Sequence, residues 1–241
     1  MRDRTLPLLV LLPGMDGTGR MFGPLLSALP QRVSTVVVAY PPDRPLGYAG
    51  LLPLVRDAIP QDGPCILLGE SFSGPLALMA ARDGAVRGVI LCASFIESPV
   101  PRFLSRLACL VNPATVRLVP WCIRRRAILR RNGSTATRAL LETIRGSVSP
   151  AVMAARVRSI LALDGAAALR ACPVPILYLA AAHDTLVTRK SLARIVRIRP
   201  DADVVTINGP HLLLQEAPAA AAGAIVKFIG EVADLPDSDA P

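Results

Sequence analysis

The chain has 241 residues, of which 52% are hydrophobic, so it is long and apolar enough for one larger α/β domain or two small ones, and it is not disordered over most of its length. Its 23 prolines and 17 glycines follow no Gly-X-Y period, which excludes a fibrous protein. The only two histidines, His183 and His211, exclude a multi-histidine metal site, and the five cysteines include no Cys-x-x-Cys pair, which excludes a zinc site and a disulfide framework.

The first half of the chain alternates short apolar runs with helical patterns. Continuous apolar runs of this length are typical of parallel strands that are covered on both faces, and strands that alternate with helices predict a parallel sheet. The predicted strands are Leu6–Leu12, Val33–Ala39, Cys65–Gly69 and Val86–Ala93, and the predicted helices are Met21–Leu29, Leu46–Ile59 and Gly74–Arg82.

This alternation stops after Phe95 and returns only near Val174. Between them, apolar residues recur at three- and four-residue spacing, which predicts helices. Strands follow at Val174–Ala180 and Val204–Ile207, and a helix follows at Ala219–Val232. The sequence therefore predicts one α/β core made of residues 1–97 and 171–233, a helical cap at 98–170 inserted after the fourth strand, and a flexible tail at 234–241.

The positive charge is concentrated in the predicted cap. The whole chain carries 27 Lys and Arg against 18 Asp and Glu, a net charge of +9, whereas residues 98–170 hold 13 arginines against two acids, Glu142 and Asp164, a net charge of +11. We interpret this segment as a solvated surface, with a docking face for an acidic partner, such as an acyl carrier, CoA or anionic lipid, as the alternative. The aromatic content of 4% and the lack of a binding motif argue against nucleic acid.

The N-terminal apolar run, Leu6–Leu12, follows two arginines and loosely imitates a signal peptide. It contains Pro7 and leads into Pro13-Gly14 rather than into a small-residue cleavage site, so a buried strand explains it better. No apolar run reaches the roughly 18 residues that a transmembrane helix needs. An odd number of cysteines without a framework favours a reducing compartment, so we expect a cytoplasmic protein without a transmembrane segment.

The run Gly-Glu-Ser-Phe-Ser-Gly at 69–74 stands where a predicted strand turns directly into a predicted helix. A serine on such a turn is held in a strained, exposed conformation, which suits a nucleophile. Its neighbours two positions before and after must be small because the strand and helix backbones crowd there, and Gly69 and Ser73 meet that need. Ser71 is therefore the candidate nucleophile, and a helix N-cap is the alternative.

A serine nucleophile needs a base, and the base needs an acid that orients it. His211 follows the last predicted strand and Asp184 follows the strand before it, so both are expected at the carboxyl edge of the sheet, with Ser71. The alternatives are His183 as the base and Glu97 as the acid, with His183 favoured as a rim residue.

The loop after the first predicted strand has the sequence Leu-Pro-Gly-Met-Asp-Gly-Thr-Gly at 12–19, and we call it the first-strand loop. Its glycines allow a tight fold against a substrate, and it lacks the lysine and the spacing of a phosphate-binding loop. Two backbone N–H groups must face the oxyanion that forms during acyl transfer. The candidates are Met15 in this loop and Phe72, which follows the nucleophile.

These motifs, with His-Asp-Thr-Leu-Val at 183–187 and Gly-Pro-His at 209–211, resemble those of α/β-hydrolase-fold serine hydrolases over nearly the whole chain. The first-strand loop and the run Gly-Pro-His-Leu-Leu-Leu-Gln are also similar, more weakly, to the plant phytyl-ester-synthase group. Pro13 stands where the family usually has histidine, and Ser73 replaces the usual second glycine. Only residues 1–5 precede the first predicted strand, so the resemblance implies a sheet trimmed to six parallel strands.

The resemblance implies a serine carboxylester hydrolase for small to medium acyl esters, with Ser71, Asp184 and His211 as the triad and no cofactor or metal. The alternative is a hydrolase or acyltransferase for carrier- or CoA-bound acyl groups, docked at the arginine-rich cap. A non-enzymatic binding protein is disfavoured because that class usually loses a triad member.

Overall fold

A computed structural model describes residues 6–98, 100, 106–129 and 133–234. Its centre is a six-stranded sheet with the strand order β2-β1-β3-β4-β5-β6, in which every neighbouring pair is parallel. This confirms the predicted six parallel strands. The strands are β1 (Leu8–Leu12), β2 (Thr35–Val37), β3 (Cys65–Glu70), β4 (Val86–Cys92), β5 (Ile176–Ala181) and β6 (Asp203–Ile207).

Strand β2 is much shorter than its apolar run predicted. It lies at the edge of the sheet, and only Thr35, Val36 and Val37 pair with β1. Alternate residues of the inner strands belong to two separate cores, because successive side chains of a strand point to opposite faces. Val10 and Leu67 pack on one face, and Leu11 and Leu68 pack on the other.

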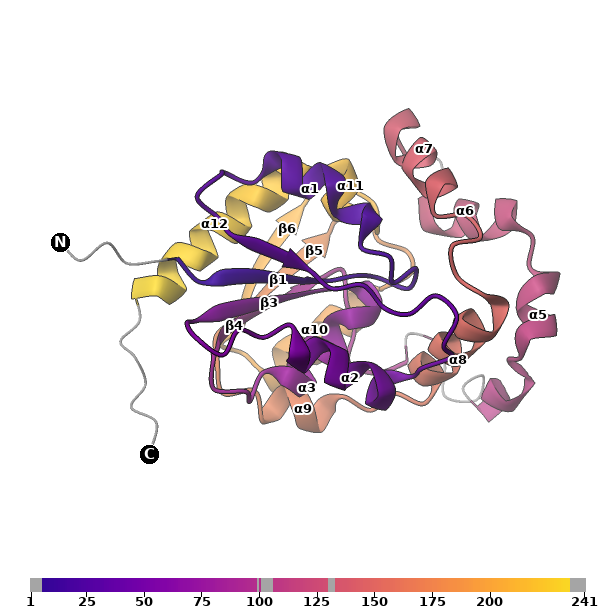
Figure 1. Cartoon of the computed structure of the whole chain (residues 1–241), viewed down its shortest axis with the longest axis horizontal. Coiled ribbons are helices and arrows are strands. Elements are labelled where there is room, and N and C mark those ends of the chain that lie inside the picture. Colours follow the sequence, from indigo (N-terminus) through magenta and orange to yellow (C-terminus); the bar gives the residue numbers. More distant parts are fainter. Residues whose placement is uncertain (1–5, 99, 101–105, 130–132, 235–241) are drawn as a thin grey trace.

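Helices cover both faces of the sheet (Figure 1). One face carries α1, α11 and α12, and the other carries α2, α3, α9 and α10. The short helical turns η1 (Arg20–Phe22) and η2 (Ser71–Ser73) lead into α1 and α3. The helices of the two layers are α1 (Gly23–Ala28), α2 (Tyr48–Asp57), α3 (Gly74–Ala80), α9 (Ala166–Arg170), α10 (Arg189–Ile198), α11 (Leu213–Glu216) and α12 (Pro218–Asp234).

The sequence did not predict α10, although two parallel strands need a crossover of this kind. Its arginines and lysine interrupt the apolar pattern, and only Ser191 and Ile195 are buried. The predicted helix Met21–Leu29 is divided into η1 and α1 at Gly23-Pro24, where proline takes an early helical position. The predicted tail lies outside the described residues except for Asp234, which ends α12.

The described part of the chain between β4 and β5 contains helices and no strand of the sheet, as predicted for an insertion after the fourth strand, while its boundaries at 98 and 170 stay a prediction. Side-chain oxygens of Asn112, Ser134 and Ser149 cap the N-termini of α5, α7 and α8. Residues 99, 101–105 and 130–132 of this predicted helical segment lie outside the described residues. Its described residues form η3 (Arg106–Leu110), α5 (Pro113–Leu118), α6 (Trp121–Leu129), α7 (Thr135–Thr143), α8 (Pro150–Leu161) and α9.

Helices α5, α6 and α7 lie at the end of the molecule opposite the start of β1 and the end of α12 (Figure 1). Trp121, Leu129 and Leu141 from α6 and α7 pack with Met21 and Leu212 of the core. Leu212 directly follows His211, so the insertion covers the part of the core that carries this histidine. We call residues 98–170 the cap from here on.

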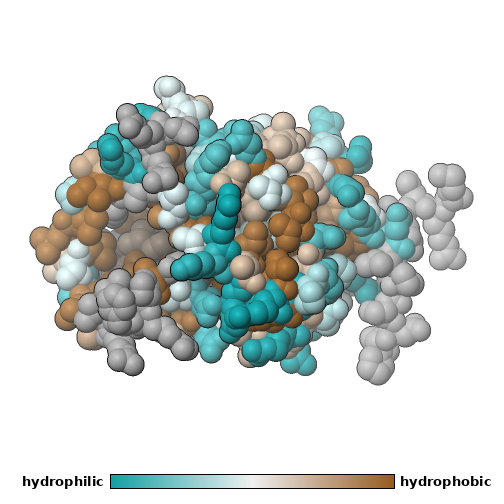
Figure 2. Space-filling model, turned by 180° about the vertical axis from the view of Figure 1, so that it is seen from behind, coloured by the Kyte–Doolittle hydropathy of each residue, from teal (hydrophilic) through white to brown (hydrophobic). Residues whose placement is uncertain are grey.

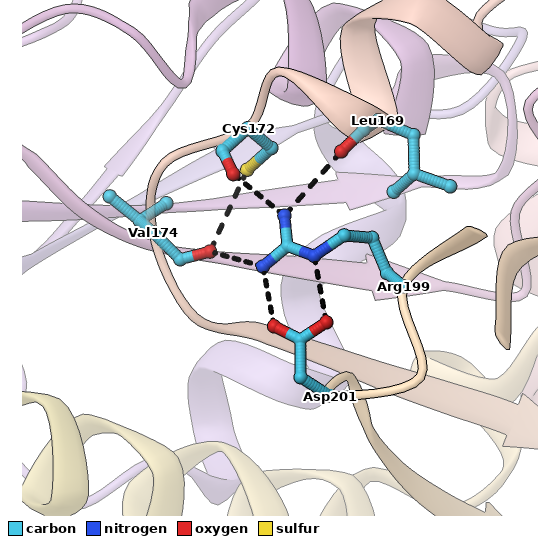
Figure 3. A network of polar contacts seen from close by, with 5 residues as sticks. All are labelled: Leu169, Cys172, Val174, Arg199 and Asp201. Carbon is cyan, nitrogen blue, oxygen red and sulfur yellow. Dashed lines mark hydrogen bonds and ion pairs between the residues drawn. The ribbon is translucent and has the colours of Figure 1, made fainter.

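Arg199 fixes the segment that enters β5 (Figure 3). Its Nη1 donates to the carbonyl oxygens of Cys172 at 2.6 Å and Leu169 at 3.4 Å, and its Nη2 donates to that of Val174 at 3.3 Å. Asp201 accepts from Nε at 2.9 Å and from Nη2 at 2.8 Å, in the two-pronged geometry that arginine and carboxylate favour. Arg199 and Asp201 thereby join the connection between α9 and β5 to the turn between α10 and β6. Strand β5 is the strand that leads to Asp184.

Candidate active site

Ser71 is the first residue of η2 and follows β3 directly, on a sharp turn where its φ is 49°, a value that non-glycine residues rarely adopt. A Cβ on Gly69 would lie 2.6 Å from the Ser73 carbonyl oxygen and 2.7 Å from the Gly74 Cα. This turn at Ser71, which we call the elbow, therefore forms only because residue 69 has no side chain. This strain is typical of functional sites, and its position matches the predicted strand–turn–helix context.

The structure brings Ser71, His211 and Asp184 together in one hydrogen-bonded chain. His211 Nε2 lies 2.9 Å from Ser71 Oγ, and His211 Nδ1 lies 2.7 Å from Asp184 Oδ2. The side chains of His211 and Asp184 are 8% and 5% exposed. Residues that are 140 and 27 positions apart thus meet at hydrogen-bonding distance beside a strained serine.

The loop after β5 holds Asp184 in this orientation. Its Oδ1 accepts the backbone N–H groups of Leu186 and Val187, both at 2.9 Å, which leaves Oδ2 for His211. These contacts fix the position of the carboxylate, so that Oδ2 faces the imidazole and can stabilise its protonated form.

The two alternative residues lie elsewhere. The His183 side chain is exposed, and its backbone N–H donates to the Gly209 carbonyl oxygen at 3.0 Å, which joins the acid loop to the histidine loop. Glu97 forms an ion pair with Arg194 of α10 at 3.4 Å. Neither residue contacts Ser71, so the geometry favours His211 over His183 and Asp184 over Glu97.

The first-strand loop offers a free N–H group beside the elbow. The Gly17 N–H donates to the Gly14 carbonyl oxygen at 3.0 Å, closing a turn. A trans peptide holds its C=O and N–H antiparallel, so the Met15 N–H points away from this turn. Within the described residues it has no hydrogen-bond acceptor. Phe72 lies in the first turn of η2, where N–H groups have no intrahelical acceptor.

The two departures from the family pattern contact each other. The Ser73 hydroxyl donates to the Pro13 carbonyl oxygen, and the Tyr40 hydroxyl lies 2.8 Å from the same Ser73 Oγ. The Tyr40 N–H also donates to the Gly17 carbonyl oxygen at 2.7 Å. Ser73 and Tyr40 therefore fasten the first-strand loop to the elbow, a role that sequence analysis did not assign to either residue.

Glu70 was also missed by sequence analysis. It precedes the serine and is buried, and its Oε1 accepts from Gln215 Nε2 at 2.9 Å. Burial raises the pKa of its carboxyl to about 7, with Asp16 adding to the rise, while Gln215, His211 and the Gly14 N–H oppose it. A charged residue at the end of an otherwise apolar strand was the signal that could have identified it.

The outward face of α5 and α6 is unusually apolar. Leu118 is 78% exposed, Leu110 58% and Ile123 56%, and Figure 2 shows brown side chains at this end of the molecule. Arg125 points the other way, toward α7, and pairs with Glu142 at 2.9 Å. The Arg125 side chain remains 40% exposed in this ion pair.

Within the described part of the chain, no helix is both long and apolar enough to cross a membrane. The same residues contain no group of three histidine, cysteine or acidic side chains that could hold a metal ion.

Several solved structures are similar to this chain in overall shape. MenH from S. aureus is 17% identical with a TM-score of 0.78 and 96% of each chain covered. A thermophilic esterase from Thermogutta terrifontis is 21% identical with a TM-score of 0.75, covering 94% of this chain and 90% of that one. A lipase-esterase related protein from Clostridium acetobutylicum is 14% identical with a TM-score of 0.76, covering 92% and 94%. At these identities the similarity concerns the fold.

One curated relative is similar over a part of its sequence. The chain is 35% identical over 109 residues to phytyl ester synthase 1, chloroplastic, of Arabidopsis thaliana. The match covers 41% of this chain and only 16% of that protein. The profile of the alpha/beta hydrolase family, in contrast, matches residues 9–224. With this match, the six-stranded parallel sheet and the shape of its neighbours, the chain belongs to the alpha/beta hydrolase family.

Proposed function

We propose that this hydrolase is a serine carboxylester hydrolase that acts on small to medium acyl esters. The observation that carries the proposal is the hydrogen-bonded chain from Ser71 Oγ through His211 to Asp184 at 2.9 and 2.7 Å. An imidazole between a strained serine and a buried carboxylate is the arrangement that activates a hydroxyl for acyl transfer.

The reaction uses each of these groups twice. Ser71 Oγ attacks the ester carbonyl while His211 Nε2 takes the hydroxyl proton, and His211 then returns that proton to the departing alcohol. A water molecule attacks the resulting acyl-enzyme with His211 again as the base, which releases the carboxylic acid and restores Ser71. Asp184 orients His211 and stabilises its protonated form.

The Met15 and Phe72 N–H groups hold the oxyanion of both tetrahedral intermediates. Two observations support this role: the Met15 N–H has no acceptor among the described residues, and Phe72 occupies the first turn of η2. Leucine and tryptophan side chains of the cap that pack beside Leu212 suit an alkyl group better than a polar substrate. We also keep a cytoplasmic location as part of this proposal.

A Ser71→Ala variant tests the proposal. We expect a loss of roughly 10³-fold or more in p-nitrophenyl ester hydrolysis with an unchanged melting temperature, because the nucleophile is lost and no packing is. A fluorophosphonate probe is expected to label the wild type at Ser71 and to leave the variant unlabelled. Full activity in a folded Ser71→Ala protein would contradict the mechanism.

A second candidate is a hydrolase or acyltransferase for acyl groups carried by an acyl carrier protein or CoA. The composition of the cap favours it, because residues 98–141 hold nine arginines and no acid, and Leu118 and Ile123 in this segment are exposed. The partial similarity to a phytyl ester synthase supports acyl transfer, in which an alcohol replaces water in the second step.

Neutralising Arg117 of α5 and Arg126 of α6, which are both exposed, separates the two candidates. This pair avoids Arg125, whose ion pair with Glu142 holds α6 on α7. For the second candidate we expect KM to rise several-fold for an acyl-carrier thioester and to stay unchanged for a small neutral ester. Salt should weaken the effect, because exposed charges are screened over about 10 Å at 0.1 M.

The matched control is Arg189→Gln with Arg197→Gln on α10, which removes the same charge from an exposed face of the core. Equal effects of the two pairs would mean that only net charge matters. Unchanged kinetics on every substrate would favour the carboxylester hydrolase with a solvated cap.

A further inference from the structure

We propose that Arg156 of the cap is a positioning residue that holds the oxyanion-binding N–H of Met15 in place. The inference rests on the proposed function, because it assigns the reason for a contact between cap helix α8 and the first-strand loop. The guanidinium Nη1 donates to the Met15 carbonyl oxygen at 2.7 Å, and Nη2 donates to the Pro41 carbonyl oxygen at 3.4 Å.

Arg156 is buried to an unusual degree for an arginine. Its relative exposure is 1%, and its Nε has no hydrogen-bond partner. Among the described residues no carboxylate forms an ion pair with it, since Asp16 uses its Oδ2 to accept the Thr18 N–H and hydroxyl. Burial lowers the pKa of the guanidinium, and Asp16 and Tyr40 only oppose that effect. A buried charge with an orphan donor costs stability, so stability alone does not explain it.

The first-strand loop is shaped to receive this side chain. Gly17 has a φ of +70°, and a Cβ there would lie 2.6 Å from Arg156 Nη1. The guanidinium also stands over the Tyr40 ring, with its central carbon 5.6 Å from the ring centre. The residue without a side chain and the aromatic ring thus form the two walls of the arginine site.

Arg156 completes the set of contacts that fix the peptides on both sides of Met15. The Gly17 N–H holds the Gly14 carbonyl oxygen, which belongs to the same peptide group as the Met15 N–H. Arg156 holds the following carbonyl, that of Met15 itself. With both peptide planes fixed, the direction of the Met15 N–H is set before substrate binds, which is what oxyanion stabilisation requires.

The charge of Arg156 acts in the same direction. Its guanidinium contacts the residue whose N–H faces the forming oxyanion, inside a region that excludes water. A fixed positive charge there favours the negatively charged tetrahedral state over the neutral ester. Arg156 therefore affects the rate of acyl transfer more than the binding of substrate.

The test compares Arg156→Met with Arg158→Met in the full-length protein. Both arginines lie on α8 and donate to a backbone carbonyl, but Arg158 is exposed and contacts Val111 of the cap, at 2.8 Å. For Arg156→Met we expect kcat on a short p-nitrophenyl ester to fall roughly 10- to 100-fold with KM within a factor of about two, after normalising to the fraction of serine that fluorophosphonate labels. Arg158→Met should match the wild type.

Two further measurements exclude a merely structural role. The inhibition constant of an alkyl trifluoromethyl ketone, which forms an oxyanion on the serine, should rise in proportion to the loss of kcat/KM, whereas that of the matching alkyl amide should not change. Arg156→Lys, which keeps the charge, should recover part of kcat. The melting temperature of Arg156→Met should stay within a few degrees of the wild type, because an orphan donor is removed with the contact.

Gly17→Ala disturbs the contact of Arg156 with Met15 from the side of the first-strand loop. Gly146→Ala is its control, because Gly146 has a similar φ of +76° and no atom within 4 Å of an added Cβ. Gly17→Ala should lower kcat, and combining it with Arg156→Met should add little, since both remove one contact. Equal kinetics of Arg156→Met and Arg158→Met in an active enzyme would overturn the inference. A wild type without esterase turnover or serine labelling would instead refute the proposed function.

Discussion

The first-strand loop and the outward face of α5 and α6 differ in which side chains are buried: an arginine is buried against the loop, whereas apolar side chains are exposed on the helix face. Against the loop, Arg156 of cap helix α8 is buried, and each of its terminal nitrogens donates to a backbone carbonyl. On the cap face, Leu118 and Ile123 are exposed beside exposed arginines. The difference indicates that the inner part of the cap packs against the first-strand loop, and that only its outer face is left to meet solvent or a partner. The two regions should therefore respond independently to mutation.

The variants with the largest expected effect test whether Ser71, His211 and Asp184 act as one unit, as the distances between them indicate. His211→Ala should lower ester hydrolysis about as much as Ser71→Ala, roughly 10³-fold or more, because triad members act as a unit. His183 lies two positions after the end of β5, and its exposed side chain lies away from Ser71. His183→Ala should therefore change the rate only modestly. Steady-state kinetics of both variants decide the matter, and an inactive His183→Ala would mean that the base is wrongly assigned.

Asp184→Asn should be the next most damaging change. The amide of this variant cannot stabilise protonated His211, and its NH2 group would face His211 Nδ1, which is itself a donor. We therefore expect a loss of roughly 10²- to 10⁴-fold in kcat. Glu97→Gln removes a carboxylate that pairs with Arg194 and should leave kcat within a factor of about two. If Glu97→Gln is the slower enzyme, the acid follows β4 rather than β5.

Glu70 should give the core a pH dependence that the cap face lacks. Its carboxyl ionises near pH 7 in the folded state and near its ordinary value when unfolded, so the unfolded state binds fewer protons in between and stability falls as pH rises from about 4.5 to 7. A shift of this size corresponds to at most about 3 kcal/mol.

Urea unfolding of wild type and Glu70→Gln across pH 4.5 to 8 measures this contribution. The variant should lose less stability over that range, because its neutral side chain pays no penalty for burial. Glu97→Gln is the control, and its profile should follow the wild type. Parallel profiles for wild type and Glu70→Gln would show that the Glu70 carboxyl is not held protonated by burial.

Ser73→Ala should have the smallest effect and sharpens the role of the family departures. It leaves the buried Tyr40 hydroxyl and the Pro13 carbonyl without a partner, which costs about 1–3 kcal/mol. Ser159→Ala, which removes a hydroxyl that bonds Ala155 within α8, should cost only a few tenths. Differential scanning calorimetry separates these values, and equal melting temperatures would mean that Ser73 does not fasten the loop.

Some expectations failed where local pattern conflicts with three-dimensional packing. The run Val33–Ala39 predicts a seven-residue strand, yet only three residues pair because β2 lies at the edge of the sheet. Helix α10 was missed because its single buried face carries few apolar residues. The described part of the cap predicted at 98–170 is helical as expected, and its Arg125 stays partly exposed while it pairs with Glu142 of α7.

The sequence by itself determined the parallel sheet, the elbow at Ser71 and the order of Ser71, Asp184 and His211. These features follow from local rules: apolar runs form buried strands, and short loops after parallel strands converge at one edge. Only the tertiary structure decided that Arg156 reaches Met15 and that Ser73 joins Pro13 to Tyr40. Those contacts join residues 141, 60 and 33 positions apart, and such partners leave no periodicity or spacing in the chain. Their geometry exists only once the cap and the first-strand loop pack against the same elbow.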